Sequence, residues 1–236
     1  MPVYALTNDL RFPDPERANR DGLLAAGGDL RVERLLLAYR LGIFPWYDDS
    51  PILWWSPPRR CVMNPATFHV SRSLQRELRR GHFSVTFDQA FPAVIRACGE
   101  TRIAEGKGTW IVEDMIDAYC ALHEAGFAHS AEAWVDGELA GGIYGVSLGR
   151  AFFGESMFTK ITNGSKVAFA SLAKQLTEWE FSLIDCQITN PHLQRLGSYE
   201  ISRKEFLRQL TQALAFPTRR GKWESPESGF TSQPYS

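Results

Sequence analysis

Two short apolar segments carry carboxylates that need a partner, either within the protein or a bound cation. Residues 153–158 (FGESMF) hold Glu155, and residues 184–187 (IDCQ) hold Asp185 and Gln187. Burying a carboxylate among apolar residues is costly unless it is paired or hydrogen-bonded. Two such carboxylates on neighbouring predicted strands, with no arginine obviously between them, favour a chemical role. A buried salt bridge, or a hydrogen bond to the backbone, is the structural alternative.

The spacing within each segment predicts which side chains act together. In an extended strand, alternate side chains point to opposite faces. We therefore expect Glu155 and Met157 on one face of their strand, and Asp185 and Gln187 on one face of theirs.

A loop rich in tryptophan and proline, 42–58 (GIFPWYDDSPILWWSPP), offers flat surfaces. Proline fixes φ and removes a backbone donor, so this stretch is neither a regular helix nor a central strand. Tryptophans on a rigid loop serve as packing anchors or as platforms for a planar group such as a nucleobase. The other motifs favour the platform interpretation for at least one of them.

Two further segments have features of phosphate-binding sites. Residues 162–166 (TNGSK) lie between a predicted strand and a long predicted helix, where free backbone amides favour an anion. An ordinary capped helix explains them equally well. A predicted helix over 71–80 carries four arginines with Glu77 as its one acid. A solvated charged face is the common explanation for such a set, yet four arginines also suit a phosphate backbone. They are Arg72, Arg76, Arg79 and Arg80.

Motifs of several other enzyme classes are absent from the sequence. It has no GxSxG elbow, no HExxH pair and no GxxxxGK[ST] loop. No cysteine–histidine cluster has zinc spacing, so we expect no metal site. His129, at the start of a predicted strand, is more often a structural residue than a catalytic one.

The hydrophobic pattern predicts the elements that position these groups. Helices are expected over 30–41, 71–80, 88–98, 112–125, 165–179 and 203–214, with Asp29, Asp88 and Asn163 as N-caps of the first, third and fifth. Strands are expected over 83–87, 130–135, 139–148, 151–158 and 181–187, with Asp136-Gly137 as a type I′ turn. Residues 22–30 are expected to form a glycine-rich turn, and the tail after Pro217 to be loose.

The order of three hairpin-linked strands, a helix and another strand predicts an α+β layer. That order resembles the fold of the GNAT acetyltransferases. The junction at 162–166 lacks the glycine-rich pattern with which GNAT enzymes hold the pyrophosphate of coenzyme A.

Bulk composition is that of a globular protein. The 236 residues are 44% hydrophobic, enough for one large domain or two smaller ones. The net charge of −1 is unlike that of a protein that wraps long duplex nucleic acid. The N-terminal stretch lacks the pattern of a secretion signal, and no apolar run is long enough to span a bilayer. We expect a cytoplasmic protein with four reduced cysteines.

Motifs spread along the chain resemble those of the bacterial leucyl/phenylalanyl-tRNA–protein transferases. They occur in this order: 22–25 (GLLA), 27–30 (GGDL), 42–46 (GIFPW), 54–57 (WWSP), 108–111 (GTWI), 141–146 (GGIYGV), 154–158 (GESMF) and 184–187 (IDCQ). The resemblance implies a small N-terminal domain with the tryptophan-rich loop, 1–62, followed by a GNAT-like catalytic domain, 63–236. It also explains the missing coenzyme A pattern, because the acyl donor is an RNA ester.

The resemblance implies an aminoacyltransferase, specifically a leucyltransferase, of the N-degron pathway. Such an enzyme moves leucine or phenylalanine, and methionine less well, from aminoacyl-tRNA to the amino group of a protein that begins with arginine or lysine. The modified protein is then marked for degradation. The ester is already activated, so no cofactor is expected. No membrane partner is expected, and a monomer is the default expectation.

Site residues follow from the same resemblance. Tyr39, Trp46 and Trp110 match residues at the terminal adenosine of the tRNA, and the four arginines of 71–80 are assigned to its backbone. Ser165 and Lys166 match a turn assigned to phosphate. The pocket for the transferred side chain matches Ile143, Met157, Phe169, Leu172, Leu176 and Ile184.

The polar centre receives roles from the chemistry of ester aminolysis. Asp185 and Gln187 are expected to orient the attacking amine, and either Asp185 or a ribose hydroxyl to take up its proton. Gln187 itself is no base, because an amide oxygen only accepts hydrogen bonds. Glu155, with help from Asp185, is expected to bind the cationic side chain of the acceptor's first residue.

Three alternatives remain open from the sequence. One is a coenzyme A-dependent N-acetyltransferase of the GNAT group, and another is a non-catalytic protein that binds RNA 3′ ends. The third, a peptidoglycan-type aminoacyltransferase that uses charged tRNA, fits less well because those proteins usually carry two GNAT-like units and are longer.

Overall fold

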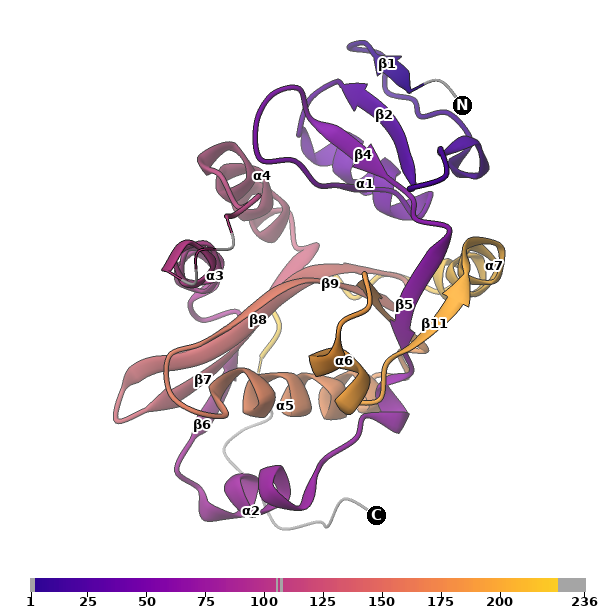
Figure 1. The fold of residues 1–236 in the computed structure, drawn as a ribbon. Coiled ribbons are helices and arrows are strands. Elements are labelled where there is room, and N and C mark those ends of the chain that lie inside the picture. Colours follow the sequence, from indigo (N-terminus) through magenta and orange to yellow (C-terminus); the bar gives the residue numbers. More distant parts are fainter. Residues whose placement is uncertain (1–2, 105, 107, 225–236) are drawn as a thin grey trace.

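The computed structural model describes residues 3–224 except 105 and 107, and it contains two β-sheets with helices around them (Figure 1). The strands are β1 (Tyr4–Leu6), β2 (Leu23–Gly27), β3 (Phe44–Pro45), β4 (Leu53–Trp55), β5 (Arg59–Met63), β6 (Ser84–Phe87), β7 (Ala128–Val135), β8 (Glu138–Leu148), β9 (Ala151–Thr159), β10 (Leu183–Gln187) and β11 (Tyr199–Ser202). The helices are α1 (Val32–Arg40), α2 (Arg72–Arg80), α3 (Phe91–Ala104), α4 (Glu113–Glu124), α5 (Gly164–Glu178), α6 (Pro191–Arg195) and α7 (Arg203–Leu214), with 3₁₀ turns η1 (Pro15–Arg17) and η2 (Pro65–Thr67).

The small sheet is built from the N-terminal segment, in the order β1-β2-β4-β3. The expected turn at 22–30 is wrong, because 23–27 forms β2, parallel to β1 and antiparallel to β4. The side chains of Leu24 and Ala25 are fully buried, which favours a strand over a solvent-exposed turn. Positive φ values flank the strand, at Gly22 before it and at Gly27 and Gly28 at its end.

The large sheet has the order β11-β5-β10-β9-β8-β7-β6. Strands β9 and β10 pair in parallel, whereas the other neighbouring pairs are antiparallel. Asp136 and Gly137 both have positive φ, which confirms the type I′ turn between β7 and β8. β5 belongs to this sheet, so the division between the two sheets falls at 56–58, slightly before the expected domain boundary at 62.

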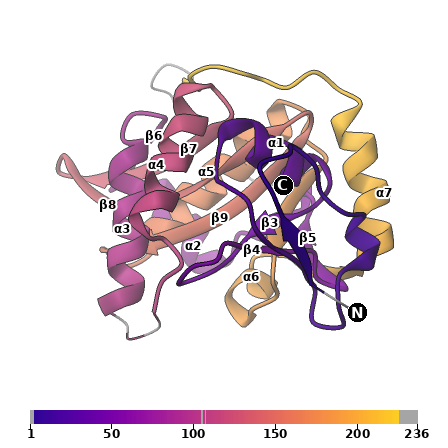
Figure 2. The ribbon, with the colours of Figure 1, turned by 90° about the horizontal axis from the view of Figure 1, so that it is seen from above.

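Helices cover both faces of the large sheet. The connection from β9 to its parallel neighbour β10 is α5, which packs beneath the sheet, while α3 and α4 lie on the opposite face together with the small sheet (Figure 1). Seen from above, α7 lies at the β5 side and α3 at the other (Figure 2). The mixed helices and sheets agree with the expected α+β class.

The expected N-caps at Asp29, Asp88 and Asn163 are wrong. The carboxylate of Asp29 accepts hydrogen bonds from the buried Arg34 (3.1 Å) and the backbone of Arg31, and α1 begins only after Arg31. Asn163 takes a left-handed conformation and its side chain caps nothing. In each case a longer-range contact or backbone geometry overrides the local preference.

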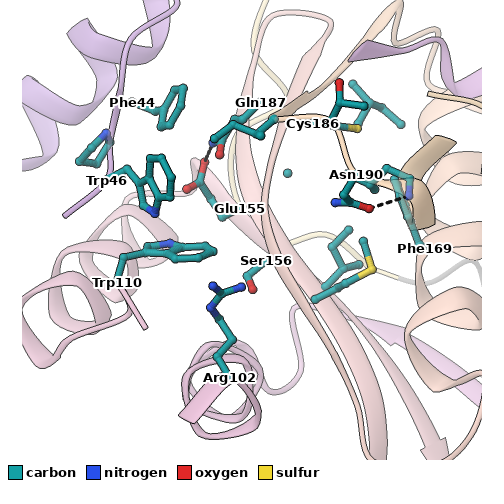
Figure 3. Close-up of a pocket in the computed structure, with 18 residues that line it drawn as sticks. Phe44, Trp46, Arg102, Trp110, Glu155, Ser156, Phe169, Cys186, Gln187 and Asn190 are labelled. Atoms are coloured by element: carbon teal, nitrogen blue, oxygen red, sulfur yellow. Dashed lines mark hydrogen bonds between the residues drawn. The ribbon is translucent and has the colours of Figure 1, made fainter. Parts of the chain in front are cut away.

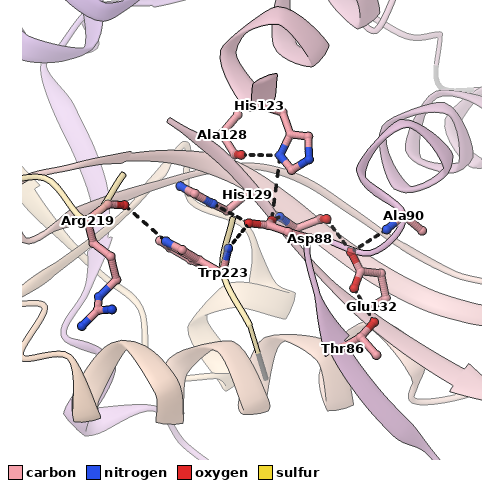
Figure 4. Close-up of polar contacts among 10 residues, drawn as sticks. Thr86, Asp88, Ala90, His123, Ala128, His129, Glu132, Arg219 and Trp223 are labelled. Carbon is pink, nitrogen blue, oxygen red and sulfur yellow. Dashed lines mark hydrogen bonds and ion pairs between the residues drawn. The ribbon is translucent and has the colours of Figure 1, made fainter. Parts of the chain in front are cut away.

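Asp88 is the centre of a buried polar cluster (Figure 4). Its carboxylate accepts hydrogen bonds from the backbone of Ser130 (2.9 Å), the backbone of Trp223 (2.7 Å) and Nδ1–H of His129 (2.8 Å). The Trp223 ring stacks on His129 with centroids 3.7 Å apart and is 2% exposed. The expected loose tail is therefore wrong for 218–224; 225–236 lie outside the described residues. His129 is a structural residue.

Candidate active site

The candidate site lies where two neighbouring strands of the large sheet separate. β9 and β10 are paired from Ala151–Leu183 to Phe153–Asp185. β9 then continues along β8 to Thr159, whereas β10 ends at Gln187. The side chains that follow the last pair surround a cavity of about 330 Å³ (Figure 3).

Each of the two strands has an irregular register at the separation. Tyr144 opposes Ser156 and Gly145 opposes Gly154, so Glu155 lies unpaired between them. On β10 the register shifts between Asp185 and Gln187, and Gln187 has a φ of +59°. Such bulges redirect side chains.

The bulges overturn the expected alternation of side chains. Consecutive residues 154–157 all line the cavity. Gln187 also lines it, whereas Asp185 is fully buried away from it. The interpretation that Asp185 and Gln187 share a face is therefore wrong.

The carboxylate of Glu155 is held in the cavity wall by three donors. It accepts hydrogen bonds from the hydroxyls of Tyr39 (2.8 Å) and Tyr119 (3.1 Å) and from Nε2–H of Gln187 (2.8 Å). Burial raises the pKa of Glu155 to about 7, and these hydrogen bonds oppose that rise. The site therefore contains a carboxylate that changes charge near neutral pH.

Tyr39 and Tyr119 lie behind Glu155. Both side chains are fully buried, and their hydroxyl oxygens contact one another. Burial, followed by the charge of Glu155, raises the pKa of each phenol, so both remain protonated donors. The structure places the Tyr39 hydroxyl against Glu155, and Tyr39 is not among the residues that line the cavity. Its assignment to the terminal adenosine stays a prediction.

The amide of Gln187 has a defined orientation. Its neighbour Glu155 offers only acceptor oxygens when ionised, so the amide nitrogen must face it. The amide oxygen of Gln187 is then left as a hydrogen-bond acceptor at the cavity, where it can receive an N–H.

Asp185 forms a buried salt bridge, which is the structural alternative to a chemical role. Arg60, from β5, donates from Nε to Oδ1 (2.8 Å) and from Nη2 to Oδ2 (2.7 Å), and both side chains are 1% exposed or less. The expectation that no arginine pairs with this carboxylate is wrong. Asp185 Oδ1 also accepts from the backbone N–H of Gln187 (2.9 Å). Asp185 thus fixes the bulge that presents Gln187.

The apolar wall of the cavity contains four of the six expected side chains: Ile143, Met157, Phe169 and Ile184. Leu172 and Leu176 do not line the cavity; both are buried, further along α5. Sequence reasoning missed Phe44, Cys186 and Leu193, which complete the wall. Cys186 lies inside the 184–187 motif, so its position between two site residues was an available signal.

Trp46 and Trp110 stand at the mouth of this cavity. Their ring centroids are 6.2 Å apart and the rings are perpendicular. Trp46 is 38% exposed and Trp110 is half-buried. The guanidinium of Arg102 lies 3.9 Å from the Trp110 ring centroid. The structure therefore brings together aromatic surfaces, an apolar cavity and a polar centre.

The expected phosphate turn lies outside this cavity. The backbone N–H of Ser165 donates to Thr159 Oγ1 (3.2 Å), and the Ser165 side chain is buried against the same threonine. Lys166 contacts Asn163 (3.4 Å). A Cβ added at Gly141 would lie 2.4 Å from the carbonyl carbon of Gly164, so β8 presses against the start of the helix. This geometry favours an ordinary helix start.

The four arginines of α2 lie on one exposed face of that helix. The helix itself lies on the α5 side of the large sheet (Figure 1). The arginines line a shallow depression with Gln75, and Arg80 also pairs with Glu77 (3.4 Å). None of them lines the cavity at Glu155.

Other candidate chemistry is sparse in the part of the chain that the structure describes. No group of three or more histidine, cysteine, aspartate or glutamate side chains there could hold a metal ion. The four cysteines are free. Among the described helices, none is both long and apolar enough to cross a bilayer.

Comparisons with known proteins give a consistent result. The family model "Leucyl/phenylalanyl-tRNA protein transferase" matches residues 62–211, and the model of that family's N-terminal domain matches 28–58. A leucyl/phenylalanyl-tRNA–protein transferase of Desulfatibacillum aliphaticivorans is 59% identical over 224 residues, covering 94% of this chain and 96% of its own length. A protein of the same name from Anaeromyxobacter sp. (strain Fw109-5) is 56% identical over 225 residues, covering 95% and 96%.

Solved structures give only a distant likeness. The structure of L-PGS from Bacillus licheniformis is 13% identical and has a TM-score of 0.40, covering 71% of this chain and 54% of that one. A likeness at this level carries no argument about function or fold.

Proposed function

The chain belongs to the leucyl/phenylalanyl-tRNA–protein transferase family, and we propose that it transfers leucine or phenylalanine, and methionine less well, to proteins that begin with arginine or lysine. As a member of this family it is an aminoacyl-tRNA–protein transferase. The product carries a new N-terminal residue that marks it for degradation by the N-degron pathway.

One observation carries the proposal. A single cavity joins the Trp46–Trp110 pair, an apolar wall and the polar centre of Glu155 and Gln187. The 3′ end of an aminoacyl-tRNA has three matching parts: a terminal base for the tryptophan pair, a side chain for the apolar wall and an ester for the polar centre. A base stacks on indole surfaces, and an unbranched or γ-branched apolar side chain suits the wall of Ile143, Met157 and Phe169.

Selection among amino acids should be modest. An apolar pocket separates side chains that differ by one methylene by roughly 10–200-fold. It excludes charged side chains more strongly, because a buried charge needs a partner. Leucine, phenylalanine and methionine thus form one substrate group.

Glu155 suits recognition of the acceptor's first residue. It is a carboxylate in an otherwise apolar wall, held by the two tyrosine hydroxyls and Gln187. An arginine or lysine side chain gains a charge-assisted contact there, and a neutral side chain leaves the carboxylate without a partner charge.

The chemistry is aminolysis of an ester. The neutral α-amine attacks the ester carbonyl carbon, the new C–N bond forms, and the bond to the ribose oxygen breaks. The amine loses one proton and the ribose oxygen gains one. An α-amino group has a pKa of about 7.7–8.0, so deprotonation near neutral pH is inexpensive. Positioning can then supply much of the acceleration.

Gln187 is the residue that orients the amine. Its amide oxygen accepts an N–H of the nucleophile, while its nitrogen is held by Glu155. Asp185 is a positioning residue: both its oxygens are occupied by Arg60 and the Gln187 backbone. It has no access to the amine, so the ribose hydroxyl of the tRNA is the better candidate for proton relay.

The remaining assignments are part of the same proposal. The large sheet, with its separated parallel pair, serves as a GNAT-like acyltransferase domain. The arginines of α2 contact the tRNA backbone beyond its 3′ end. The enzyme acts as a monomer in the cytoplasm, where its charged tRNA donor is made.

The coenzyme A alternative has less support. It needs free amides at the start of α5, and Thr159 already accepts from the Ser165 amide. A non-catalytic RNA-end binder would need the tryptophans but leaves Glu155 and Gln187 without a role.

Transfer of labelled leucine to an arginine-led peptide tests the proposal. We expect transfer from leucyl-tRNA to the arginine-led peptide, little transfer to a matched peptide that begins with alanine, and no acetylation of either peptide with acetyl-coenzyme A. Acetylation without leucyl transfer would replace the proposal by the acetyltransferase. Tight binding of tRNA with no transfer to any peptide would replace it by the RNA-end binder.

A further inference from the structure

A second cavity continues outward from the first. It has a volume of about 340 Å³ and shares Trp46, Trp110 and Arg102 with the cavity at Glu155. We call it the outer cleft. Its remaining lining is Tyr47, Asp48, Leu53, Trp55, Gly108 and Thr109. The tryptophan pair thus lines both spaces, which adjoin at these shared side chains.

Trp55 gives the outer cleft an aromatic surface of its own. Its Nε1–H donates to the backbone oxygen of Trp46 (2.7 Å), and the two rings are 5.6 Å apart at 59°. The side chain is half-buried, so one part packs and another faces the cleft. The hydrogen bond holds the ring in place, and a preorganised indole binds a flat base at little entropic cost.

Arg102 lies at the border of the two cavities. It rises from α3 toward Trp110 and Ser156 (Figure 3) and lines both spaces. Its guanidinium stacks on Trp110 at 3.9 Å. A stacked guanidinium still directs its N–H groups along its own plane, a geometry that suits phosphate.

Asp48 adds a selective group to the outer cleft. Its carboxylate is an acceptor exposed at the lining. Of the two pyrimidine bases, cytosine presents an amino donor at N4 and uracil presents an acceptor oxygen. An acidic side chain therefore favours cytosine.

We propose that the outer cleft binds the penultimate nucleotide of the donor RNA, a cytidine in the universal CCA end. Its base packs on Trp55, its amino group donates to Asp48, and the phosphate that links it to the terminal adenosine contacts Arg102. This inference rests on the proposed function, because it requires the adenosine in the first cavity. It extends the binding site to a second base.

Minimal donors isolate this contribution. The phenylalanyl ester of adenosine fills only the first cavity, and the esters of cytidylyl-adenosine and uridylyl-adenosine reach the outer cleft. We expect cytidylyl-adenosine to exceed adenosine by about 10- to 100-fold in kcat/KM, as one stacked base provides. Cytidylyl-adenosine should also exceed uridylyl-adenosine.

Substitutions then assign the effect to the cleft. Trp55→Ala should reduce the advantage of cytidylyl-adenosine over adenosine to a few-fold. Asp48→Asn should remove the preference for cytidine over uridine, because an amide also donates to uracil O4. Asp49→Asn is the matched control: it changes the neighbouring acid, which does not line the cleft, and should keep the wild-type preference.

Equal kcat/KM for the adenosine and cytidylyl-adenosine donors would overturn the proposal. So would an unchanged cytidine preference in Asp48→Asn, which tests the cleft even if Trp55→Ala disturbs Trp46. Transfer from intact leucyl-tRNA, measured in parallel, distinguishes failure of the outer-cleft proposal from failure of the proposed function. Transfer with no dinucleotide advantage refutes the outer cleft alone, whereas no transfer from any donor refutes the proposed function.

Discussion

The buried Arg60–Asp185 pair yields a prediction that separates folding from catalysis. Arg60→Met removes both hydrogen bonds to Asp185 and leaves a fully buried carboxylate without its counter-charge. Breaking such a pair costs about 3–5 kcal/mol. The guanidinium also lies over the rings of Phe44 (4.7 Å) and Phe206 (4.3 Å), contacts that methionine replaces only in part.

The double variant Arg60→Met, Asp185→Leu should recover most of that stability. Replacing a buried ion pair by apolar residues of similar volume is often neutral or stabilising. The backbone N–H of Gln187, however, loses its acceptor at Asp185, and the left-handed bulge at Gln187 loses the contact that holds it. A shift of about 1 Å there is expected to slow transfer about 100-fold.

Urea denaturation followed by tryptophan fluorescence measures the stability, and single-turnover transfer measures the chemistry. Arg59→Met is the matched control, because Arg59 is the exposed neighbour, and its change should stay within about 0.5 kcal/mol. A double variant with wild-type stability and wild-type transfer rate would refute the positioning role of Asp185. A loss below about 1 kcal/mol in Arg60→Met would contradict the buried pair itself.

Three further predictions concern the cavity and the far side of the sheet. Glu155→Gln should abolish the preference for arginine-led over alanine-led peptides. In the wild-type enzyme that preference should fall as the pH drops below about 7, because the Glu155 carboxyl is neutral below its raised pKa. The ratio of the transfer rates to the two peptides cancels the titration of their amines. A wild-type ratio that stays constant from pH 6 to pH 8, about one unit either side of the Glu155 pKa, would count against this role. Trp46→Ala should raise KM for aminoacyl-adenosine about 10- to 100-fold with little change in kcat; an unchanged KM would exclude stacking there. Trp223→Ala should destabilise the protein by about 3–5 kcal/mol and leave transfer by the folded fraction intact, which denaturation and an active-fraction assay can check.

The sequence predicts the main elements and places two of the three expected polar residues, Glu155 and Gln187, in the cavity. Period-2 alternation and the Asp136-Gly137 signal locate the β7–β8 hairpin, and the aromatic loop and the 184–187 motif point to residues that the fold brings into one cavity. These features depend on residues close together in the sequence, so they can be predicted from a single sequence.

Contacts between distant segments are what the sequence does not predict. Arg60 and Asp185 are 125 residues apart, and their pairing depends on the register between β5 and β10. The bulge at Glu155 likewise depends on how β8 and β9 align. Strand alternation alone assigns Asp185 and Gln187 to one face, and the bulge reverses that.

Capping residues fail for a related reason. Asp88 has the right type and place to cap a helix, yet its carboxylate gains three donors from β7 and the C-terminal segment. A local preference of about 1 kcal/mol is easily outweighed by such a set. The same segment shows why composition misjudged the tail: one buried tryptophan, Trp223, orders it.

A structure with a hydrolysis-resistant phenylalanyl-adenosine, its ester replaced by an amide, tests the central claim most directly. We predict the adenine against Trp46 and Trp110, the phenyl ring among Ile143, Met157 and Phe169, and the carbonyl within reach of Gln187. Binding of the analogue elsewhere, with this cavity left empty at saturating concentration, would contradict the account.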